Sequence, residues 1–492
     1  MTLQKKELLL FQQLDEAFFV LFLAPDHKKI KPALEKLNLG FEPYFLSSFL
    51  SSKDSLNNWT AIKESSLSFV MGTRSAIFAP VNNLGLIIIE EEGHFAYTQE
   101  QSPHYKTSDV AFWRSEFTES KLVLGCFAPS LDAYHFQLIK KRSQASGERG
   151  YVSCKSDRPW PVLKMIDMRH DGRFAGSEKI ISKVFEYHIA DCLQKKEKIL
   201  IFVNRKGFST FLYCKKCEKV QSCPRCSASL VYFQEEKIAA CPVCHHKTEL
   251  FDICQECKSS YIKFFGCGVQ KVEREIKRLF PMAKIIFFDK PLEIEEQAFF
   301  SSFDIILVTQ QFFESFFWYE YIFDSVCVIS CDEMIGGPDF RSTEKAFLKL
   351  MRLGKIANKN LCIQTRMSGH YIFKYLKNFD IEGFHAHEFK LRKELKLPPY
   401  RRMGALVVRS KELEIAERLS LDIFNDLKSL SNKKAHLLCF EPVPCAPLKV
   451  RGKYRFQIFL KFLDINKIRP FLKKYLDRRN KNAIVTIETN IS

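Results

Sequence analysis

The chain has 492 residues, enough for about three domains of ordinary size. Apolar residues make up 46% of it, so sizeable cores can form, but no uninterrupted apolar run reaches the about twenty residues that a membrane-spanning helix needs. The formal net charge is +18 and the sequence pI is near 9.1. This excess favours a polyanionic partner, most commonly nucleic acid, although lysine drift in an AT-rich genome is a competing explanation.

Short apolar runs alternate with helical patterns through the first part of the chain. We expect helices at Leu3–Ala17 and Lys28–Leu37, and buried strands at Phe18–Leu23, Leu67–Met71, Leu84–Ile89 and Lys121–Leu124. This alternation is typical of a parallel α/β sheet, whose functional loops follow the strands. A polar stretch around Ser143–Asp157 indicates a linker, so residues 1–150 are expected to form a first lobe.

The same pattern returns after the linker and predicts a second lobe over residues 151–212 and 263–372. Its expected strands are Ile199–Val203, Lys284–Phe288, Phe303–Val308, Ser325–Ser330 and Leu361–Gln364, and its expected helices are Ser177–Leu193, Val272–Phe280 and Thr343–Leu353. Residues 213–262 interrupt this lobe as a cysteine-rich insert. The pattern changes again near Phe373, and a separate C-terminal α+β domain is expected over residues 373–492.

The insert contains four Cys-x-x-Cys pairs. They are Cys214 with Cys217, Cys223 with Cys226, Cys241 with Cys244, and Cys254 with Cys257. One such pair directs two thiolates at a tetrahedral ion, and two pairs complete a four-cysteine zinc site, so eight ligands predict two zinc ions. Disulfides are the alternative, but they need an oxidising compartment and no signal peptide precedes the insert. The remaining cysteines follow no spacing rule and are interpreted as reduced thiols.

Several motifs together resemble the PriA family, bacterial superfamily-two DNA helicases that restart replication. The matching stretches are Gly72–Pro80, Asn83–Ile89, Tyr97–Tyr105, Phe202–Phe208, the eight cysteines, Asp339–Arg341, Pro398–Tyr400 and Lys449–Gln457. The resemblance covers the helicase lobes, the zinc insert and the C-terminal domain, and not the family's N-terminal DNA-binding domains. It implies two RecA-like lobes in a bacterial cytoplasmic protein.

The resemblance also implies a nested pairing of the zinc ligands. The outer cysteines, Cys214, Cys217, Cys254 and Cys257, would share one ion, and the inner cysteines, Cys223, Cys226, Cys241 and Cys244, would share the other. Spacing alone leaves the sequential pairing open. In the family this module binds DNA and primosome proteins, which implies forked or single-stranded DNA, the single-stranded-DNA-binding protein and the helicase loader as partners. His94, His104, His245 and His246 lie beside motifs, but no third metal site is expected from them.

The motifs of ATP hydrolysis depart from the family pattern. No Gly-x-x-x-x-Gly-Lys-Ser/Thr stretch exists, and the resemblance would put the P-loop just before Met1. The degenerate positions are Glu90-Glu91-Glu92-Gly93 (motif II), Cys126-Phe127-Ala128 (motif III), Val308–Gln311 (motif V), and Lys355 and Asn358 in place of two motif VI arginines. Loss of an arginine finger alone costs about a thousandfold in turnover. We therefore expect no intact catalytic residue, and ATP and magnesium binding stay open.

The candidate DNA-contacting residues each have a plain structural alternative. They are Arg74, Tyr97, Tyr105, Arg205 and Arg341. Arg74 and Arg205 could instead pair with carboxylates. Glu90–Glu92 could be a solvated acidic turn, and the aromatic run Phe312–Tyr321 is more often core than a base-stacking platform.

Three functions remain open on the sequence. The leading hypothesis is a zinc-containing DNA-binding protein of replication restart without an active ATPase motor. The second is an ATP-dependent 3′–5′ DNA helicase whose P-loop lies upstream of Met1, so the chain's status as an enzyme is undecided. The third is a decaying gene product, which the intact set of eight cysteines argues against.

Overall fold

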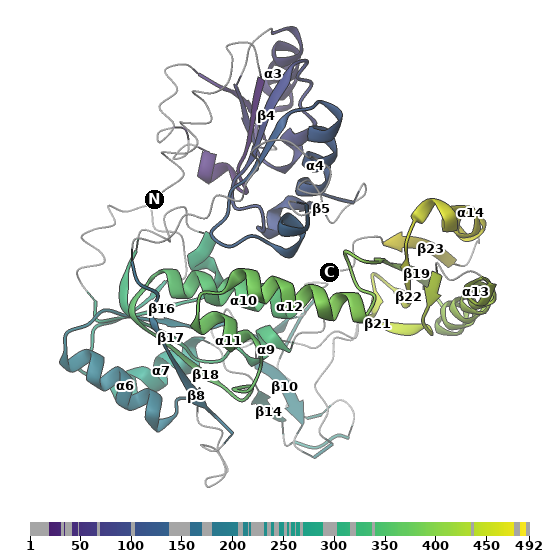
Figure 1. Cartoon of the computed structure of the whole chain (residues 1–492). Helices are drawn as coiled ribbons and strands as arrows, with labels where there is room; N and C mark the ends of the chain where they lie inside the picture. Colours follow the sequence, from purple (N-terminus) through teal and green to yellow (C-terminus); the bar gives the residue numbers. More distant parts are fainter. Residues whose placement is uncertain are drawn as a thin grey trace.

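The computed structural model contains two α/β lobes, a small insert and a C-terminal domain (Figure 1). It describes residues 19–30, 34, 42–47, 49–65, 69–99, 104–136, 158–169, 180–204, 210–214, 216–217, 231–233, 238–240, 246–249, 253–254, 257–260, 262–265, 269–288, 303–314, 321–336, 340–433, 437–476 and 483–488. The expected fold class is confirmed by this architecture. Among the described helices, none combines the length and the apolar character needed to cross a bilayer.

Lobe 1 is built on a parallel sheet with the strand order β2-β3-β1-β4-β7. Its strands are β1 (Phe19–Leu23), β2 (Tyr44–Leu46), β3 (Phe69–Gly72), β4 (Leu84–Ile89) and β7 (Lys121–Leu124). The residues of β1 are buried throughout, as expected for an apolar run between two neighbouring strands. β7 is half-exposed and ends the sheet within the described residues, whereas the apolar strand β4 lies inside it.

The helices of lobe 1 are α3 (Ser52–Glu64) and α4 (Thr107–Phe117), neither of which the apolar pattern predicted. α3 begins where the Ser51 side chain accepts a hydrogen bond from the Asp54 amide, an ordinary N-cap. Of the expected helix Lys28–Leu37 the structure describes residues 28–30 and 34: a 3₁₀ turn, His27–Lys29, overlaps its start, and Ile30 and Leu34 are helical. The expected helix Leu3–Ala17 lies outside the described residues. Two short strands, β5 (Thr98–Gln99) and β6 (Tyr105–Lys106), pair beside α4.

Lobe 2 carries a second parallel sheet with the order β15-β16-β9-β17-β18-β8. Its strands are β8 (Val162–Asp167), β9 (Ile199–Phe202), β15 (Ile285–Phe288), β16 (Ile305–Val308), β17 (Phe323–Val328) and β18 (Ala357–Thr365). Its helices are α6 (Lys183–Gln194), α7 (Val269–Leu279), α9 (Asp332–Ile335), α10 (Ser342–Lys355), α11 (Ile372–Lys377) and α12 (Ile381–Glu394). Phe312 and Phe313 are buried in this lobe's core, so this part of the aromatic run packs the fold.

The insert and the C-terminal domain are both built on antiparallel sheets. The strands of the insert are β10 (Thr210–Cys214), β11 (Val231–Phe233), β12 (Ile238–Ala240), β13 (Lys247–Glu249) and β14 (Ile262–Phe265). In the sheet they lie in the order β13-β12-β11-β10-β14, so the first and the last strand of the insert are neighbours. The C-terminal sheet contains β19 (Arg402–Ser410), β20 (Leu437–Cys439), β21 (Val443–Val450), β22 (Lys453–Phe462) and β23 (Ala483–Glu488), and is packed by α13 (Leu413–Lys433) and α14 (Ile465–Leu476). The expected domain boundary at residue 373 falls before α12 and within α11, and both helices share the core of lobe 2.

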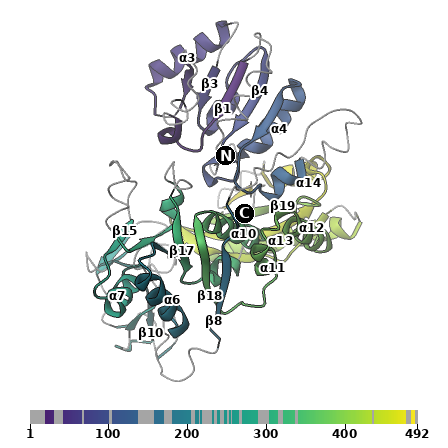
Figure 2. The same cartoon turned by 60° about the vertical axis from the view of Figure 1, so that its left-hand side comes forward.

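Helices α10 and α12 pack in the core of lobe 2 beside its sheet. In Figure 1 they run below lobe 1, and the turned view in Figure 2 keeps lobe 1 on the same side of α10. The C-terminal domain begins just beyond the end of α12. Loops that follow the strands of lobe 1 therefore meet the helices that cover lobe 2.

Candidate metal centre and interlobe site

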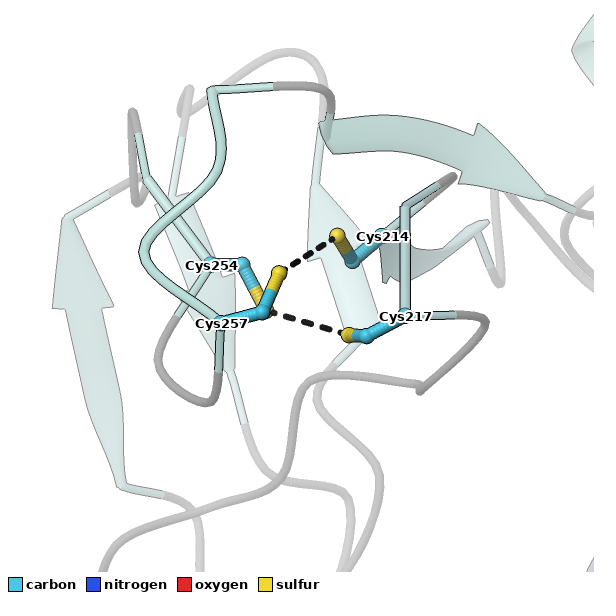
Figure 3. Close-up of side chains that lie close together, drawn as sticks. All are labelled: Cys214, Cys217, Cys254 and Cys257. Atoms are coloured by element: carbon cyan, nitrogen blue, oxygen red, sulfur yellow. Dashed lines mark hydrogen bonds between the residues drawn. The ribbon is translucent and has the colours of Figure 1, made fainter.

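The outer cysteine pairs of the insert converge on one point. Cys214 ends β10, which pairs with β14 so that Cys214 lies opposite Ile262, and this pairing brings the two ends of the insert together. The Sγ atoms of Cys214 and Cys257 are 3.5 Å apart, and those of Cys217 and Cys254 are 3.6 Å apart (Figure 3). All four sulfur atoms lie within 4.8 Å of one another. This cluster could hold a metal ion, and tetrathiolate coordination suits zinc.

The local backbone shapes this cluster for thiolate ligands. The Cys254 amide donates to the carbonyl oxygen of Ser259, and the Lys258 amide donates to that of Cys254, which closes a tight turn around the second pair. Hydrogen bonds from the backbone at Cys217 and Lys216 lower the pKa of the Cys214 thiol.

The inner cysteines of the insert are not placed by the structure. Cys223, Cys226, Cys241 and Cys244 all lie outside the described residues. The second zinc site that was expected from them therefore stays a prediction, as does the nested arrangement of the two ions. The convergence of the outer pairs agrees with the nested arrangement, because the sequential alternative would pair Cys214 and Cys217 with Cys223 and Cys226 instead.

A lysine of the same chain pairs with an acidic side chain of the turn that follows β4. Glu91 adopts a left-handed backbone with φ of 50°, and its Oε1 lies 2.7 Å from Nζ of Lys29. The lysine side chain is 2% exposed and the glutamate side chain 15%. A buried carboxylate needs a charged or hydrogen-bonding partner, and Lys29 supplies it here.

The two acids that flank Glu91 are both buried, so the alternative of a solvated acidic turn is wrong. Glu92 accepts hydrogen bonds from the amide of Ser130 at 2.6 Å and from its hydroxyl at 3.0 Å, while burial raises the pKa of Glu92. The hydroxyl of Tyr97 lies 2.8 Å from the Glu90 carbonyl oxygen and 2.9 Å from that of Leu23. The turn is therefore tied to β1, to the segment after β7 and to the loop that carries Tyr97.

Residues 130–136, which we call the interlobe segment, connect lobe 1 to α10 and α12. The Leu131 amide donates to Oε1 of Glu344 at 2.7 Å, and Arg392 donates to the other oxygen of Glu344 at 2.8 Å. Arg392 also contacts Glu388 at 3.3 Å, and all three charged side chains are buried. Because one buried carboxylate serves groups from both lobes, it fixes the spacing between them.

A second ion-pair group lies beside this carboxylate. Asp132 lies 2.8 Å from Nζ of Lys106 and 3.2 Å from Arg341 of lobe 2. Burial alone would raise the pKa of Asp132, but the charges of Lys106 and Arg341 outweigh it and hold the pKa well below its usual range. Lys355 lies over the ring of Phe127 at 5.6 Å, so these remnants of motifs VI and III contact each other.

The candidate DNA-contacting residues fall into different environments. Arg74 donates to the carbonyl oxygens of Ala96 and Thr98 at 3.1 and 3.0 Å, so it holds the loop that follows the acidic turn. Tyr97 is buried, and Tyr105 is half-buried with its ring 5.1 Å from that of Phe78. Arg341 is the partner of Asp132 just described. Arg205 lies outside the described residues.

Lys29, Ser130, Glu344 and Arg392 were not found by the motif analysis. Each acts through a partner far away in sequence, such as the 213 positions that separate Leu131 from Glu344. No spacing rule links such positions. The one feature of the sequence that could have pointed to such residues is a charged residue within an apolar pattern, as at Glu344 in the first turn of α10.

Comparison with known proteins identifies similar chains. The Primosomal protein N C-terminal domain family matches residues 393–490. The Replication restart protein PriA of Bacillus subtilis is 30% identical over 92% of this chain and 58% of its own length, and that of Borreliella burgdorferi is 28% identical over 95% and 71%. The protein of the same name in Thermotoga maritima is 28% identical over 95% of this chain and 63% of its own.

The chain therefore spans about three fifths of the length of several curated relatives that it matches. The similarity includes both lobes and the insert as well as the C-terminal domain. The resemblance inferred from the motifs is thus confirmed, and the chain is a relative of the replication restart proteins PriA whose residues 393–490 carry that family's C-terminal domain.

Proposed function

We propose that the chain is a PriA-like, zinc-containing DNA-binding protein of replication restart that works without an ATPase motor. The relatives named Replication restart protein PriA support the process. The single observation that carries the absence of a motor is the acidic turn, where Lys29 pairs with one oxygen of Glu91 and Ser130 donates to both oxygens of Glu92. A magnesium–nucleotide complex needs carboxylate oxygens that are open to the ion. Three of the four carboxylate oxygens of Glu91 and Glu92 already have a partner, and the fourth, Oε2 of Glu91, is buried.

The DNA-binding part of the proposal rests on the basic surface at the end of α12. Burial lowers the pKa of Lys461, and the like charges of Arg401 and Lys396 lower it further. Like charges that are crowded in this way favour a polyanion, because phosphate groups relieve their mutual repulsion. This group lies in the basic patch Lys390–Arg402 and on the neighbouring strand β22. Forked or single-stranded DNA is the proposed ligand, and primosome proteins such as the single-stranded-DNA-binding protein and the helicase loader are proposed partners.

The zinc part of the proposal extends the observed cluster to two ions. The outer cysteines would hold one ion as a closed structural site, and the inner cysteines the other. In the insert the sheet is small, so metal binding would supply much of its folding free energy. The ions would hold β10 and β14 together and give the insert a defined surface for DNA or a protein partner.

The test follows fork binding and ATP hydrolysis in the same zinc-loaded samples. Fluorescence anisotropy with a labelled fork is recorded between about 50 and 200 mM KCl, a range over which six to ten phosphate contacts weaken binding by about 10³ to 10⁵-fold. We expect steep salt dependence and no hydrolysis with or without DNA. Hydrolysis stimulated by DNA would instead support an ATP-dependent 3′–5′ helicase, and binding that is absent or insensitive to salt would overturn the proposal.

A further inference from the structure

A second group of thiols and an imidazole lies in the core of lobe 2, away from the insert. His188 and Cys192 are four residues apart on α6 and therefore share one face of this helix. Cys327 on β17 and Cys362 on β18 are register partners on adjacent parallel strands. α6 packs against these strands in a shared core, which brings His188 to the two thiols and places Cys192 beside His188.

The distances among three of these groups are those of a metal site, and the fourth, Cys192, contacts His188. The ligand atoms of His188, Cys327 and Cys362 all lie within 4.8 Å of one another. Sγ of Cys192 lies 3.8 Å from Nε2 of His188. A tetrahedral zinc ion with bonds of about 2.3 Å to sulfur and 2.0 Å to nitrogen separates its ligand atoms by about 3.5 to 3.8 Å. The outer cysteines of the insert, at 3.5 and 3.6 Å, show a similar spacing.

The residue types are unusual for this core. Its other buried positions are mainly Ile, with a few Val, Leu and Phe, and an imidazole buried among them is costly unless it has a partner. Nε2 of His188 now lies 2.8 Å from Oγ of Ser325, and this hydroxyl lies 3.8 Å from Sγ of Cys327. If Nε2 turned to an ion, the Ser325 hydroxyl would be free to donate to a thiolate, so the cluster contains a second-sphere donor for the bound state.

We propose that His188, Cys327 and Cys362 form a further metal site for a thiophilic divalent cation, with zinc as the first candidate. Cys192, whose Sγ contacts His188, would complete it as the fourth ligand once its side chain rotates toward the ion. Three S–H bonds would break and release their protons to solvent, while three metal–sulfur bonds and one metal–nitrogen bond form without oxidation or reduction. The ion would join α6 to the two central strands β17 and β18. This site is separate from the insert and does not depend on the proposed DNA binding.

The test counts metal ions in the full chain by native mass spectrometry and by elemental analysis of the same samples. The double variant Cys327→Val, Cys362→Val replaces the thiols with β-branched apolar side chains of similar size, which suit strands, so it is expected to fold. We expect one zinc equivalent fewer per chain than in the parent. The matched control Cys331→Val removes a thiol that is buried in the other core of lobe 2, and it should leave the metal count unchanged.

A second measurement keeps the proposal testable if the double variant does not fold. The parent chain is loaded with Co²⁺, and Cys192→Ala alone should weaken the sulfur-to-cobalt charge-transfer band by the share of one thiolate while the bands of the insert persist. An unchanged metal count in the folded double variant would overturn the proposal. A parent chain that is two mass units lighter, with Cys327 joined to Cys362 as a disulfide, would also overturn it.

Discussion

Nζ of Lys29 lies 2.7 Å from Oε1 of Glu91, a carboxylate that is 62 positions away in sequence. The pair joins the loop after β1 to the turn after β4, at the edge where parallel strands of lobe 1 end. In an α/β protein this edge is where ligands bind, because the loops after the strands meet there. Here a lysine ammonium neutralises an acid of that edge from within the chain. The ion pair therefore places a positive charge of the chain itself at the edge where a ligand of such a fold binds.

Lys29→Met should destabilise lobe 1 strongly. The substitution leaves the Glu91 carboxylate mostly buried without its counter-charge, and breaking a buried pair in this way costs about 3 to 5 kcal/mol. Chemical denaturation followed by circular dichroism measures the change. The control Lys195→Met removes an exposed pair with Asp191 and should cost less than about 1 kcal/mol. Equal effects of the two substitutions would show that Lys29 does not neutralise a buried charge.

Glu344→Gln should loosen the contact between the lobes. The amide side chain keeps the size of glutamate but lacks the charge that Arg392 needs, and it offers one acceptor oxygen where two are used. We expect a decrease of about 2 to 4 kcal/mol in unfolding free energy, and hydrogen exchange at the Leu131 amide that is at least about tenfold faster. The control Glu394→Gln changes an exposed residue of α12. Unchanged exchange at Leu131 would contradict a direct link through Glu344.

His385 should make the stability depend on pH between about 4 and 6.5. Its ring lies 4.8 Å from that of Tyr134 in the interlobe segment, and burial lowers the pKa of His385 to about 4. The unfolded chain therefore binds more protons in this window, so stability is full above about pH 6.5 and falls as the pH approaches 4. Each unit of pKa shift corresponds to about 1.4 kcal/mol.

Denaturation of His385→Phe at several pH values tests this dependence. The slope of unfolding free energy against pH should be smaller than in the parent chain. It should not be zero, because burial also lowers the pKa of His94 to about 4. His104→Gln, at an exposed position of lobe 1, is the control and should keep the parent's slope. An equal slope in all three proteins would show that His385 has no part in it.

The sequence predicted the strands of both lobes much better than the residues that connect the lobes. Runs such as Leu84–Ile89 are buried on both faces of a sheet, and this burial is visible as continuous apolar character. β8 was missed because it is an edge strand in which exposed and half-buried residues alternate. Glu344 and Arg392 could not be predicted, since the value of a buried ion pair depends on the tertiary fold that brings its members together.

The cysteine site shows the opposite situation. Cys-x-x-Cys is a local pattern, so spacing alone predicted the ligands Cys214, Cys217, Cys254 and Cys257. The choice of which pairs meet was not local, and only the pairing of β10 with β14 brings the outer two together. The proximity of His188 and Cys327 could not be predicted from a motif, because one residue lies on a helix, the other on a strand, and no motif contains both.

Lys396→Gln together with Arg402→Gln should weaken fork binding through charge alone. Both residues are exposed on the basic surface that runs from the end of α12 to the start of β19. Removing one phosphate contact should reduce the slope of log affinity against log salt by about 0.9, so a reduction of up to about 1.8 is expected for the two substitutions. The control Arg278→Gln removes a cation that is paired with Glu275 on α7. If the double variant keeps the parent's slope of log affinity against log salt, as the control is expected to do, DNA does not use this surface.

Cys214→Ser should remove one metal ion and unfold the insert without unfolding the lobes. A serine hydroxyl is a poor zinc ligand at neutral pH, and structural zinc contributes about 10 to 16 kcal/mol to the folding of small zinc modules. Hydrogen exchange should accelerate in β10 and β14, which the cluster joins, and stay slow in β9, which is buried in the core of lobe 2. The control Cys439→Ser changes a half-buried thiol of the C-terminal domain and should keep the parent's metal content. If β10 and β14 exchange as slowly in Cys214→Ser as in the parent, the sheet holds itself together and the cluster is not a structural metal site.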